Sequence, residues 1–327
     1  MHAIIATAAG GPDVLDFIEV DDPTPGPRDL LVRAVAAGVN FIDTYRRSGV
    51  YPMTYPHVVG SEGAGEVVAV GAQVEGFAVG DLVAWADAPS SYAELVVVPA
   101  RVALPVPAGV DPLVAAALPL QGMTAHYLVA STFPVSEGQD VLVHAGAGGV
   151  GLLLTQLAVA RGARVISTVG SPEKEELARA AGATDVIRYT ELADLTEELP
   201  AIVRGLTGGK GVHTVFDGVG RSTFDASLAS LRPRGGLALF GGASGQVPPV
   251  DPQRLNRAGS VFLTRPTLAH YTASPEETRW RVGELFDAVV GGTLDVRIGA
   301  QFPLEDAAEA HRALEGRATT GKVVLVA

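Results

Sequence analysis

Residues 146–151 read Gly-Ala-Gly-Gly-Val-Gly, which fits the G-x-G-x-x-G spacing of a phosphate-binding turn. The turn follows an apolar run at 140–145 and opens a helical stretch at 150–161, and a second apolar run comes at 164–169. Glycines let the backbone turn tightly and approach a pyrophosphate without a Cβ in the way. The free N–H groups and the positive dipole end of the helix would then face the phosphates. This context favours a dinucleotide-binding turn over an ordinary glycine-rich connection.

The end of the second apolar run indicates which dinucleotide binds. An NAD-preferring site usually carries Asp or Glu there for the ribose 2′-hydroxyl. Here Gly170 and Ser171 follow the run, and Lys174 comes next among only three lysines in the chain. A hydroxyl and a cation suit a 2′-phosphate, which favours NADPH, although Lys174 could also be an ordinary surface lysine. We expect Glu173 to face solvent in the first turn of the next helix.

Composition narrows the class of protein. The 327 residues suffice for two domains, and 47% hydrophobic with 18% charged residues is typical of a compact globular chain. No apolar run approaches the roughly 20 residues that span a bilayer. Residues 1–5 lack the features of a signal peptide, so we expect no membrane partner and a cytoplasmic location. A formal net charge of −12 argues against a nucleic-acid partner.

The pattern along the chain predicts an α/β protein of two domains. Up to residue 122, closely spaced apolar runs such as 30–35 and 94–98 predict a compact barrel-like sheet, with one short helix at 40–47. From 123 to 265, apolar runs alternate with helical stretches, which predicts a parallel, doubly wound sheet with strands at 140–145, 164–169, 185–187, 213–216 and 237–240.

The last part of the chain predicts a return to the first domain. We expect helices at 275–291 and 304–315 and a terminal strand at 322–326. A lone terminal strand must pair with something, and the first domain's sheet is the expected host. The predicted domains are therefore 1–122 with 266–327, and 123–265.

These motifs resemble the zinc-independent quinone oxidoreductases of the medium-chain dehydrogenase/reductase superfamily, the group that includes zeta-crystallin. The resemblance covers essentially the whole chain, and its most specific stretches are residues 38–45, 48–52 and 145–151, with 216–220 and 264–266 in support. It implies a GroES-like β-barrel domain joined to a Rossmann domain, an active site in the cleft between them, and a homodimer formed through the Rossmann domain.

The resemblance also implies which residues bind NADPH. Asn40 and the residues after it should line the nicotinamide side, a glycine pair should meet the pyrophosphate, and the residues after the second strand should hold the adenosine phosphate. His126 occupies a place where relatives can have tyrosine. The full cofactor set is Phe41, Ile42, Asp43, Thr44, Tyr45, His126, Gly148, Gly149, Val150, Gly170, Ser171, Lys174, Tyr189, Gly218, Phe240, Gly241, Thr264, Arg265 and Arg317.

We expect no metal site. Zinc-dependent relatives use cysteine and a Gly-His-Glu segment, whereas this chain has no cysteine and the corresponding segment is Gly60-Ser61-Glu62. His57 with Glu62 and Asp43 would be a poor zinc set. A chain without a bound Lewis acid is poorly suited to simple alcohol dehydrogenation.

A quinone or an α,β-unsaturated carbonyl accepts hydride without a metal, because its conjugated system spreads the arriving charge. The protein then supplies orientation and hydrogen-bond donors, for which Asn40, Tyr45 and Tyr51 are the catalytic candidates. The alternative for each is structural, with Asn40 capping the short helix and the tyrosines packing at its ends. The sequence therefore predicts an NADPH-dependent quinone reductase that acts on a small molecule.

Two other functions stay open. One is an NADPH-dependent enoyl or 2-alkenal reductase of the same superfamily, whose motifs barely differ. The other is a non-catalytic protein, RNA-binding or structural, as has been linked to zeta-crystallin relatives; the charge of −12 speaks against RNA binding.

Overall fold

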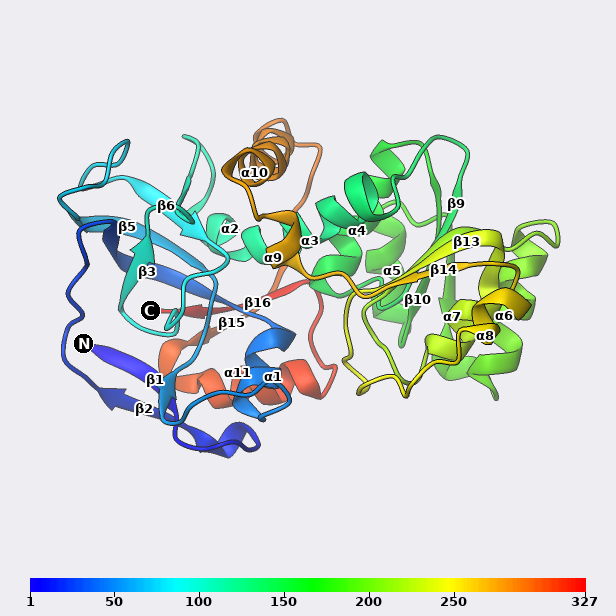
Figure 1. Cartoon of the computed structure of the whole chain (residues 1–327), viewed down its shortest axis with the longest axis horizontal. Helices are drawn as coiled ribbons and strands as arrows, with labels where there is room; N and C mark the ends of the chain where they lie inside the picture. The colour runs from blue at the N-terminus through cyan, green and yellow to red at the C-terminus, as the bar shows by residue number, and fades with distance from the viewer. The chain divides into compact units, whose positions relative to one another are not determined.

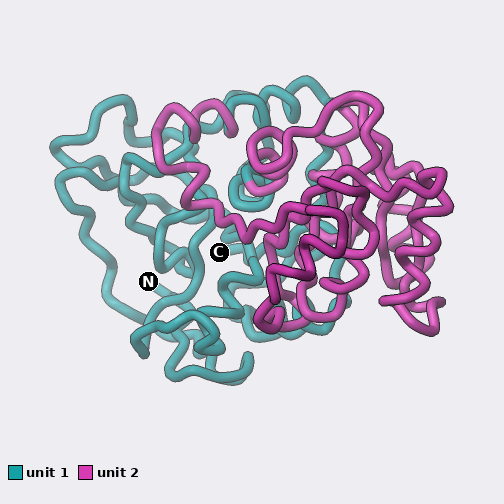
Figure 2. Tube along the Cα trace, turned by 45° about the vertical axis from the view of Figure 1, so that its right-hand side comes forward, with its two compact units in different colours: residues 1–123, 282–327 teal, residues 124–281 magenta.

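The computed structural model describes every residue from Met1 to Ala327, and the chain forms two compact units. Unit 1 comprises Met1–Met123 with Val282–Ala327, and unit 2 comprises Thr124–Arg281 (Figure 2). The sequence placed the second boundary at 265/266, whereas unit 2 continues to Arg281. The reason is local, because the Arg281 guanidinium donates to the backbone oxygen of Tyr271 and to Ser131 Oγ. These bonds tie residues 266–281 to unit 2.

Unit 2 contains a six-stranded sheet in which every neighbouring pair is parallel (Figure 1). The order is β11-β10-β9-β12-β13-β14, which is 3-2-1-4-5-6 counted from β9, the doubly wound Rossmann order. The predicted parallel sheet is confirmed, and β14 is an additional edge strand. The bounds are β9 Asp140–Val143, β10 Arg164–Val169, β11 Asp185–Arg188, β12 Val212–Asp217, β13 Leu231–Leu239 and β14 Phe262–Thr264.

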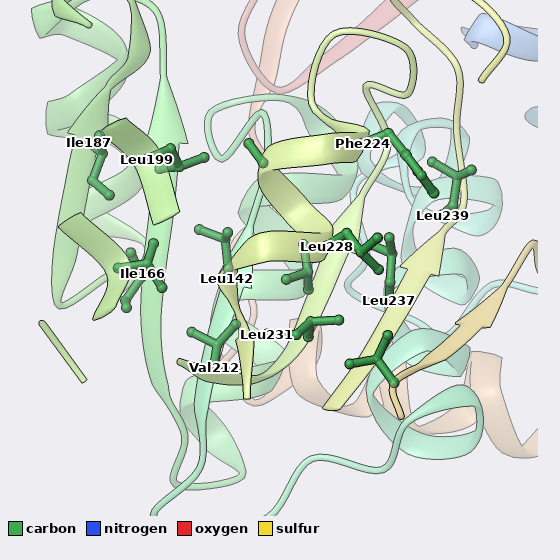
Figure 3. Packing of buried hydrophobic residues seen from close by; sticks show 14 residues of the cluster. Leu142, Ile166, Ile187, Leu199, Val212, Phe224, Leu228, Leu231, Leu237 and Leu239 are labelled. Carbon is green, nitrogen blue, oxygen red and sulfur yellow. The ribbon is translucent and has the colours of Figure 1, made fainter. Parts of the chain in front are cut away.

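The sheet is held rigid by apolar side chains that meet helices. Leu142 of β9 and Leu237 of β13 share one buried cluster with Leu199 of α6 and Phe224 of α7 (Figure 3). Burying each such side chain contributes about 1.5–3 kcal/mol, so the strand ends are fixed platforms for the loops that follow them. The helices are α4 Gly149–Ala160, α5 Pro172–Ala180, α6 Leu195–Leu206, α7 Phe224–Ser230, α8 Gln253–Arg257 and α9 Leu268–Tyr271.

Unit 1 is built on a second sheet of order β15-β16-β3-β5-β6-β8, with β7 paired to β3 as well, and a smaller sheet β2-β1-β4. The terminal strand β16 pairs antiparallel with β3, which confirms the predicted return of the chain end, and it pairs parallel with β15. The bounds are β1 His2–Ala6, β2 Leu15–Glu19, β3 Asp29–Val39, β4 His57–Val58, β5 Gly63–Val70, β6 Leu82–Trp85, β7 Leu95–Pro99, β8 Leu104–Pro105, β15 Ile298–Pro303 and β16 Lys322–Val326.

The helices of unit 1 include the short helix that the sequence predicted after β3. It begins at Phe41, directly after the N-cap Asn40, and ends at Arg47. The predicted helix at 304–315 starts instead with a 3₁₀ turn over Leu304–Asp306, after which α11 begins. The helices of unit 1 are α1 Phe41–Arg47, α2 Pro112–Ala117 and α11 Ala307–Glu315, and two further helices, α3 Pro119–Tyr127 and α10 Pro275–Val290, cross the boundary between the units. None of the helices has the length and apolar character to cross a membrane.

Candidate functional site

The glycine turn of unit 2 joins β9 to α4 and leaves the start of the helix open. Gly148 is the N-cap of α4, and no side chain bonds the first N–H groups of the helix. By contrast, Ser171 Oγ accepts the Lys174 N–H at the start of α5. An uncapped helix start lined with glycine suits an anion. The structure thus fits a dinucleotide pyrophosphate at this turn.

The glycines in this turn have different physical tasks. A Cβ at Gly146 would overlap Ser167 Oγ, and a Cβ at Gly151 would overlap the backbone oxygen of Ala145. A Cβ at Gly148 would meet only that same oxygen, at 3.2 Å, and otherwise point into open space. Gly146 and Gly151 are therefore required by the fold, whereas Gly148 keeps clear the space in front of the helix.

The residues that the sequence selected in unit 2 gather past the C-terminal ends of all six strands, with His126 as the exception. In doubly wound sheets, ligands bind at this edge, where the helix starts also lie. The residues are Gly148, Gly149 and Val150 after β9, Gly170, Ser171 and Lys174 after β10, Tyr189 after β11, Gly218 after β12, Phe240 and Gly241 after β13, and Thr264 and Arg265 at β14.

The nearest acid after β10 is Glu173, whose pKa is lowered by hydrogen bonds from its own backbone and from the Ser171 side chain. Ser171 caps α5, Lys174 is half-buried in its first turn, and Glu173 is exposed to solvent. Gly170 gives space to a neighbouring ring, because a Cβ there would lie 2.6 Å from the Tyr189 hydroxyl oxygen. The serine hydroxyl, the lysine and the tyrosine therefore border one strand end.

The ends of β12 and β13 pack tightly on each other. A Cβ at Gly218 would lie 2.8 Å from the Phe240 ring, and a Cβ at Gly241 would overlap the Gly218 oxygen. Arg265 Nη1 donates to the Phe240 oxygen at 2.9 Å. Gly218, Phe240, Gly241 and Arg265 thus form one packed corner.

His126 lies apart from these strand ends. It is fully buried in α3, its Nδ1 lies 3.2 Å from Arg281 Nη1, and its ring meets the Trp280 ring edge to face.

A buried polar network beneath this edge was not predicted from the sequence. Asp217 Oδ1 accepts from the N–H groups of Val219 and Gly220, and Oδ2 accepts from Ser227 Oγ at 2.7 Å. Ser227 also bonds His144 Nε2, at 3.0 Å. Burial lowers the pKa of His144, so the imidazole is neutral. The carboxylate of Asp217 thereby fixes the loop that contains Gly218.

In unit 1, Asn40 follows β3 and its amide group is saturated. Its Nδ2 donates to Glu62 Oε2 at 2.7 Å and to the Gly38 oxygen at 3.3 Å. Its Oδ1 accepts from Lys322 Nζ at 2.8 Å and from Gln121 Nε2 at 3.3 Å. An amide offers two donors and two acceptor positions, so none is left over. The predicted helix-capping role of Asn40 is confirmed, because Asn40 is the N-cap of α1 and forms a capping box with Asp43.

The reciprocal bond of this capping box comes from Asp43, in the first turn of α1. Asp43 Oδ2 accepts the Asn40 N–H at 2.9 Å, which is one half of a capping box. Lys322 and Glu62 form an ion pair beside Asn40, with both side chains buried. Asn40, Asp43, Glu62 and Lys322 are therefore one fully packed cluster.

The aromatic candidates form a ladder on the more open side of α1. The rings of Phe41 and Tyr45 lie 6.1 Å apart, and those of Tyr45 and Tyr51 lie 5.6 Å apart, edge to face. All three are half-buried, and Ile42 is too, while Thr44 is buried. Arg317 lies elsewhere in unit 1, between α11 and β16, with a left-handed φ of 58°.

Comparison with known proteins identifies the family. Family models match residues 26–108 (alcohol dehydrogenase GroES-like domain) and 149–279 (zinc-binding dehydrogenase). A protein of Pseudomonas aeruginosa named quinone oxidoreductase is 44% identical over 98% of this chain and 97% of its own. This chain belongs to the quinone oxidoreductase family of the medium-chain dehydrogenase/reductase superfamily.

Two further comparisons extend this result. A mycobacterial protein solved as a complex with NADPH superposes on this chain with a TM-score of 0.97, 54% identity and full coverage of both chains. A 2-haloacrylate reductase of Burkholderia sp. is 41% identical over 99% of this chain and 98% of its own. The family match confirms the predicted GroES-like and Rossmann folds.

This family member has no group of three or more His, Cys, Asp or Glu side chains placed to hold a metal ion. His57, which the sequence weighed as a ligand, bonds the Thr54 oxygen through Nδ1 at 3.2 Å. The expectation of a metal-free site stays a prediction.

Sequence reasoning missed several buried partners in this family member. Glu62 and Lys322 were each visible, Glu62 in the Gly-Ser-Glu segment and Lys322 as one of three lysines, but nothing linked them to Asn40. Tyr92 and His311 gave no local signal, because their partners lie far away in the sequence.

Proposed function

We propose that this chain is an NADPH-dependent quinone reductase. The observation that carries the proposal is the uncapped, glycine-lined start of α4 at the centre of a six-stranded parallel sheet. A positive helix end without a protein partner suits the pyrophosphate of a dinucleotide. The names of the relatives, and the NADPH complex of the mycobacterial protein, support the same reading.

The choice of NADPH over NADH is supported by the end of β10. Ser171 and Lys174 border this strand end, and Glu173, the nearest acid, is exposed. A cation and a hydroxyl favour a 2′-phosphate, whereas an inward carboxylate would repel it. Tyr189 would lie by the adenine ribose, and Gly218, Phe240, Gly241, Thr264, Arg265 and Arg317 would complete the cofactor wall. His126 is left out of this set, because it is fully buried against Arg281 and Trp280.

Bound NADPH supplies the hydride, and the chain's own residues supply position. Gly148, Gly149 and Val150 would hold the pyrophosphate, and the segment from Asn40 to Tyr45 would face the nicotinamide. Because the Asn40 amide is saturated, its contribution is to fix the end of β3 rather than to donate to the acceptor oxygen. The phenols of Tyr45 and Tyr51 are then the candidates for orienting the acceptor and donating to its oxygen.

We propose that unit 1 is the catalytic domain and unit 2 the dinucleotide-binding domain of a homodimer. Support for the dimer comes from β14, which pairs with β13 on one side only and exposes 60% of Phe262. An unpaired edge strand with an exposed phenyl ring is suited to join the same strand of a second copy.

A second candidate is reduction of a small unsaturated acid, favoured by the 41% identical 2-haloacrylate reductase. The two acceptors differ in shape and charge, since a quinone is planar and neutral. The ladder of Phe41, Tyr45 and Tyr51 favours the planar acceptor, because aromatic faces and edges stack on one another. NADPH oxidation with a naphthoquinone and with 2-chloroacrylate, measured side by side, decides between them.

Lys174→Ala tests the cofactor assignment. We expect its Kd for NADPH to rise about 10- to 100-fold, the worth of a charge-assisted hydrogen bond, with little change for NADH. Titration by cofactor fluorescence measures both. The matched control is Lys210→Ala, an exposed lysine between α6 and β12, which should change neither Kd. Equal NADPH and NADH affinities, unaltered in Lys174→Ala, would overturn the NADPH assignment.

A further inference from the structure

A chain of buried side chains leaves α1 at its last residue and returns to its first turn. Arg47, 2% exposed, lies with Nη1 3.0 Å from His311 Nδ1 and forms two further bonds to Glu315. His311 Nε2 lies 3.2 Å from the Tyr92 hydroxyl, which donates to Asp43 Oδ2 at 3.2 Å. Both ends of a seven-residue helix are therefore connected through α11 and Tyr92.

The donor and the acceptor of each hydrogen bond between these side chains follow from their chemistry. A guanidinium only donates, so His311 Nδ1 must accept from Arg47 and the ring proton must sit on Nε2. That N–H donates to the Tyr92 oxygen, and the Tyr92 O–H is directed to Asp43. Burial, with the Arg47 charge nearby, lowers the pKa of His311 to about 3, so the ring stays neutral. No bond in the chain can reverse without breaking its neighbour.

Tyr92 is held in place by its own backbone and by a glycine. Its backbone N–H donates to the backbone oxygen of Val59 at 2.9 Å, and its backbone oxygen accepts from the Ile4 N–H at 2.9 Å. Gly60 has a φ of 94°, and a Cβ there would overlap the Tyr92 ring. The hydroxyl that reaches Asp43 is thus fixed by backbone bonds to β1 and to the residue after β4, and by the close approach of Gly60.

Asp43 is the acceptor on which this chain ends. Besides Tyr92, it accepts from the Asn40 N–H at 2.9 Å and from Ser61 Oγ at 3.3 Å. Burial raises the pKa of Asp43 to about 6, because a carboxylate out of water loses its hydration. The three donors are all made to bind an ionised carboxylate, so protonation would leave one of them without its partner.

Charged groups on other elements act on the same carboxyl. Arg46 of α1 and Lys322 of β16 lower the pKa of Asp43, as do its hydrogen bonds from Asn40 and Tyr92. Glu62 acts on Tyr92, whose pKa burial and Asp43 raise far above the working range, so the phenol keeps its proton.

We propose that Arg47, His311 and Tyr92 form a positioning relay that holds Asp43 ionised and thereby fixes the orientation of α1 and Asn40. The inference rests on the proposed function, in which the segment from Asn40 to Tyr45 faces the nicotinamide. None of the three relay residues is assigned a contact with cofactor or acceptor. They act through Asp43, which caps the helix that carries the site.

Tyr92→Phe tests the relay with little change in volume. The wild-type enzyme should lose kcat as the pH falls and Asp43 protonates. Hydrogen bonds to a carboxylate lower its pKa, so removing this one should move the acid limb of the kcat profile up by about one pH unit. The profile is measured from pH 5 to 8 with NADPH and a naphthoquinone, at saturating levels of both.

Two variants make the result specific. Tyr55→Phe removes a phenol that donates to the backbone oxygen of Arg46 at the other end of α1, so its profile should match the wild type. Asp43→Asn keeps an acceptor for the Asn40 and Tyr92 donors and turns an amide N–H toward Ser61, so its acid limb should vanish.

The outcomes separate the relay from the proposed function. If the wild-type protein does not oxidise NADPH with a quinone, the proposed function is overturned. An active enzyme in which Tyr92→Phe and Tyr55→Phe share the wild-type profile overturns the relay alone. An acid limb that persists unchanged in Asp43→Asn does so as well.

Discussion

At the scale of single residues, the saturated amide of Asn40 changes what this side chain can do. Its orientation follows from chemistry, because only Oδ1 can face the Lys322 ammonium and only Nδ2 can face Glu62. An asparagine that looked like a donor to the acceptor is instead the centre of a buried ion pair. Such a pair gives little net stability while it is complete, but breaking it leaves an uncompensated charge.

Lys322→Met should therefore destabilise the protein by about 3–5 kcal/mol, because Glu62 would stay buried without its cation. Chemical denaturation measures the change in the free energy of unfolding. Lys210→Met, at an exposed site, should change it by no more than about 0.5 kcal/mol. Adding Glu62→Gln to Lys322→Met removes the stranded charge and should recover part of the loss. A double variant less stable than the single one would contradict the buried-charge explanation.

At the scale of elements, the turn between β9 and α4 contains glycines that the fold requires and one glycine, Gly148, that cofactor binding requires. Gly151 has no space for a Cβ against the Ala145 backbone, whereas Gly148 has ordinary backbone angles and mostly open surroundings. A methyl group on Gly148 would occupy the region where we propose the pyrophosphate.

Gly148→Ala should accordingly keep its stability within about 1 kcal/mol, since only a helix cap changes, and should lose most of its NADPH affinity. Gly151→Ala should lose stability first, because backbone would have to move. Thermal unfolding of the apo-protein, paired with NADPH titration, gives the comparison. If Gly148→Ala binds NADPH like the wild type, the pyrophosphate does not lie against this turn.

Elements also differ in how well the sequence predicts them. Strands β10 and β16 match the predicted ranges, because nearly all of their residues are buried inside a sheet and most are β-branched or apolar. Strand β15 was missed because, at a sheet edge, its residues alternate between half-buried and exposed positions, and β14 was missed because it has three residues. The unit 2 site could be predicted from local motifs at strand ends. The unit 1 network could not, since its partners lie as far apart as Arg47 and Glu315.

At the scale of the whole molecule, the chain must bring its two ends together to complete unit 1. The last strand pairs beside β3, whose end leads directly into Asn40 and α1, and it contributes Lys322 to the buried pair there. Unit 2 is continuous in sequence, and its sheet ends in β14, with one edge unpaired and Phe262 exposed. Assembly would therefore be governed by unit 2, far in sequence from the residues of the relay.

Phe262→Lys should convert the proposed dimer into a monomer, because a charge on an edge strand opposes pairing with another strand. Sedimentation velocity at micromolar concentrations measures the mass in solution. Val79→Lys is the matched control, since Val79 lies in unit 1 and is 65% exposed, close to the 60% of Phe262. The control should sediment like the wild type. A wild-type protein that sediments as a monomer, or a Phe262→Lys variant that remains dimeric, would rule out assembly through β14. Unaltered NADPH binding in a monomeric variant would show that cofactor binding does not depend on assembly.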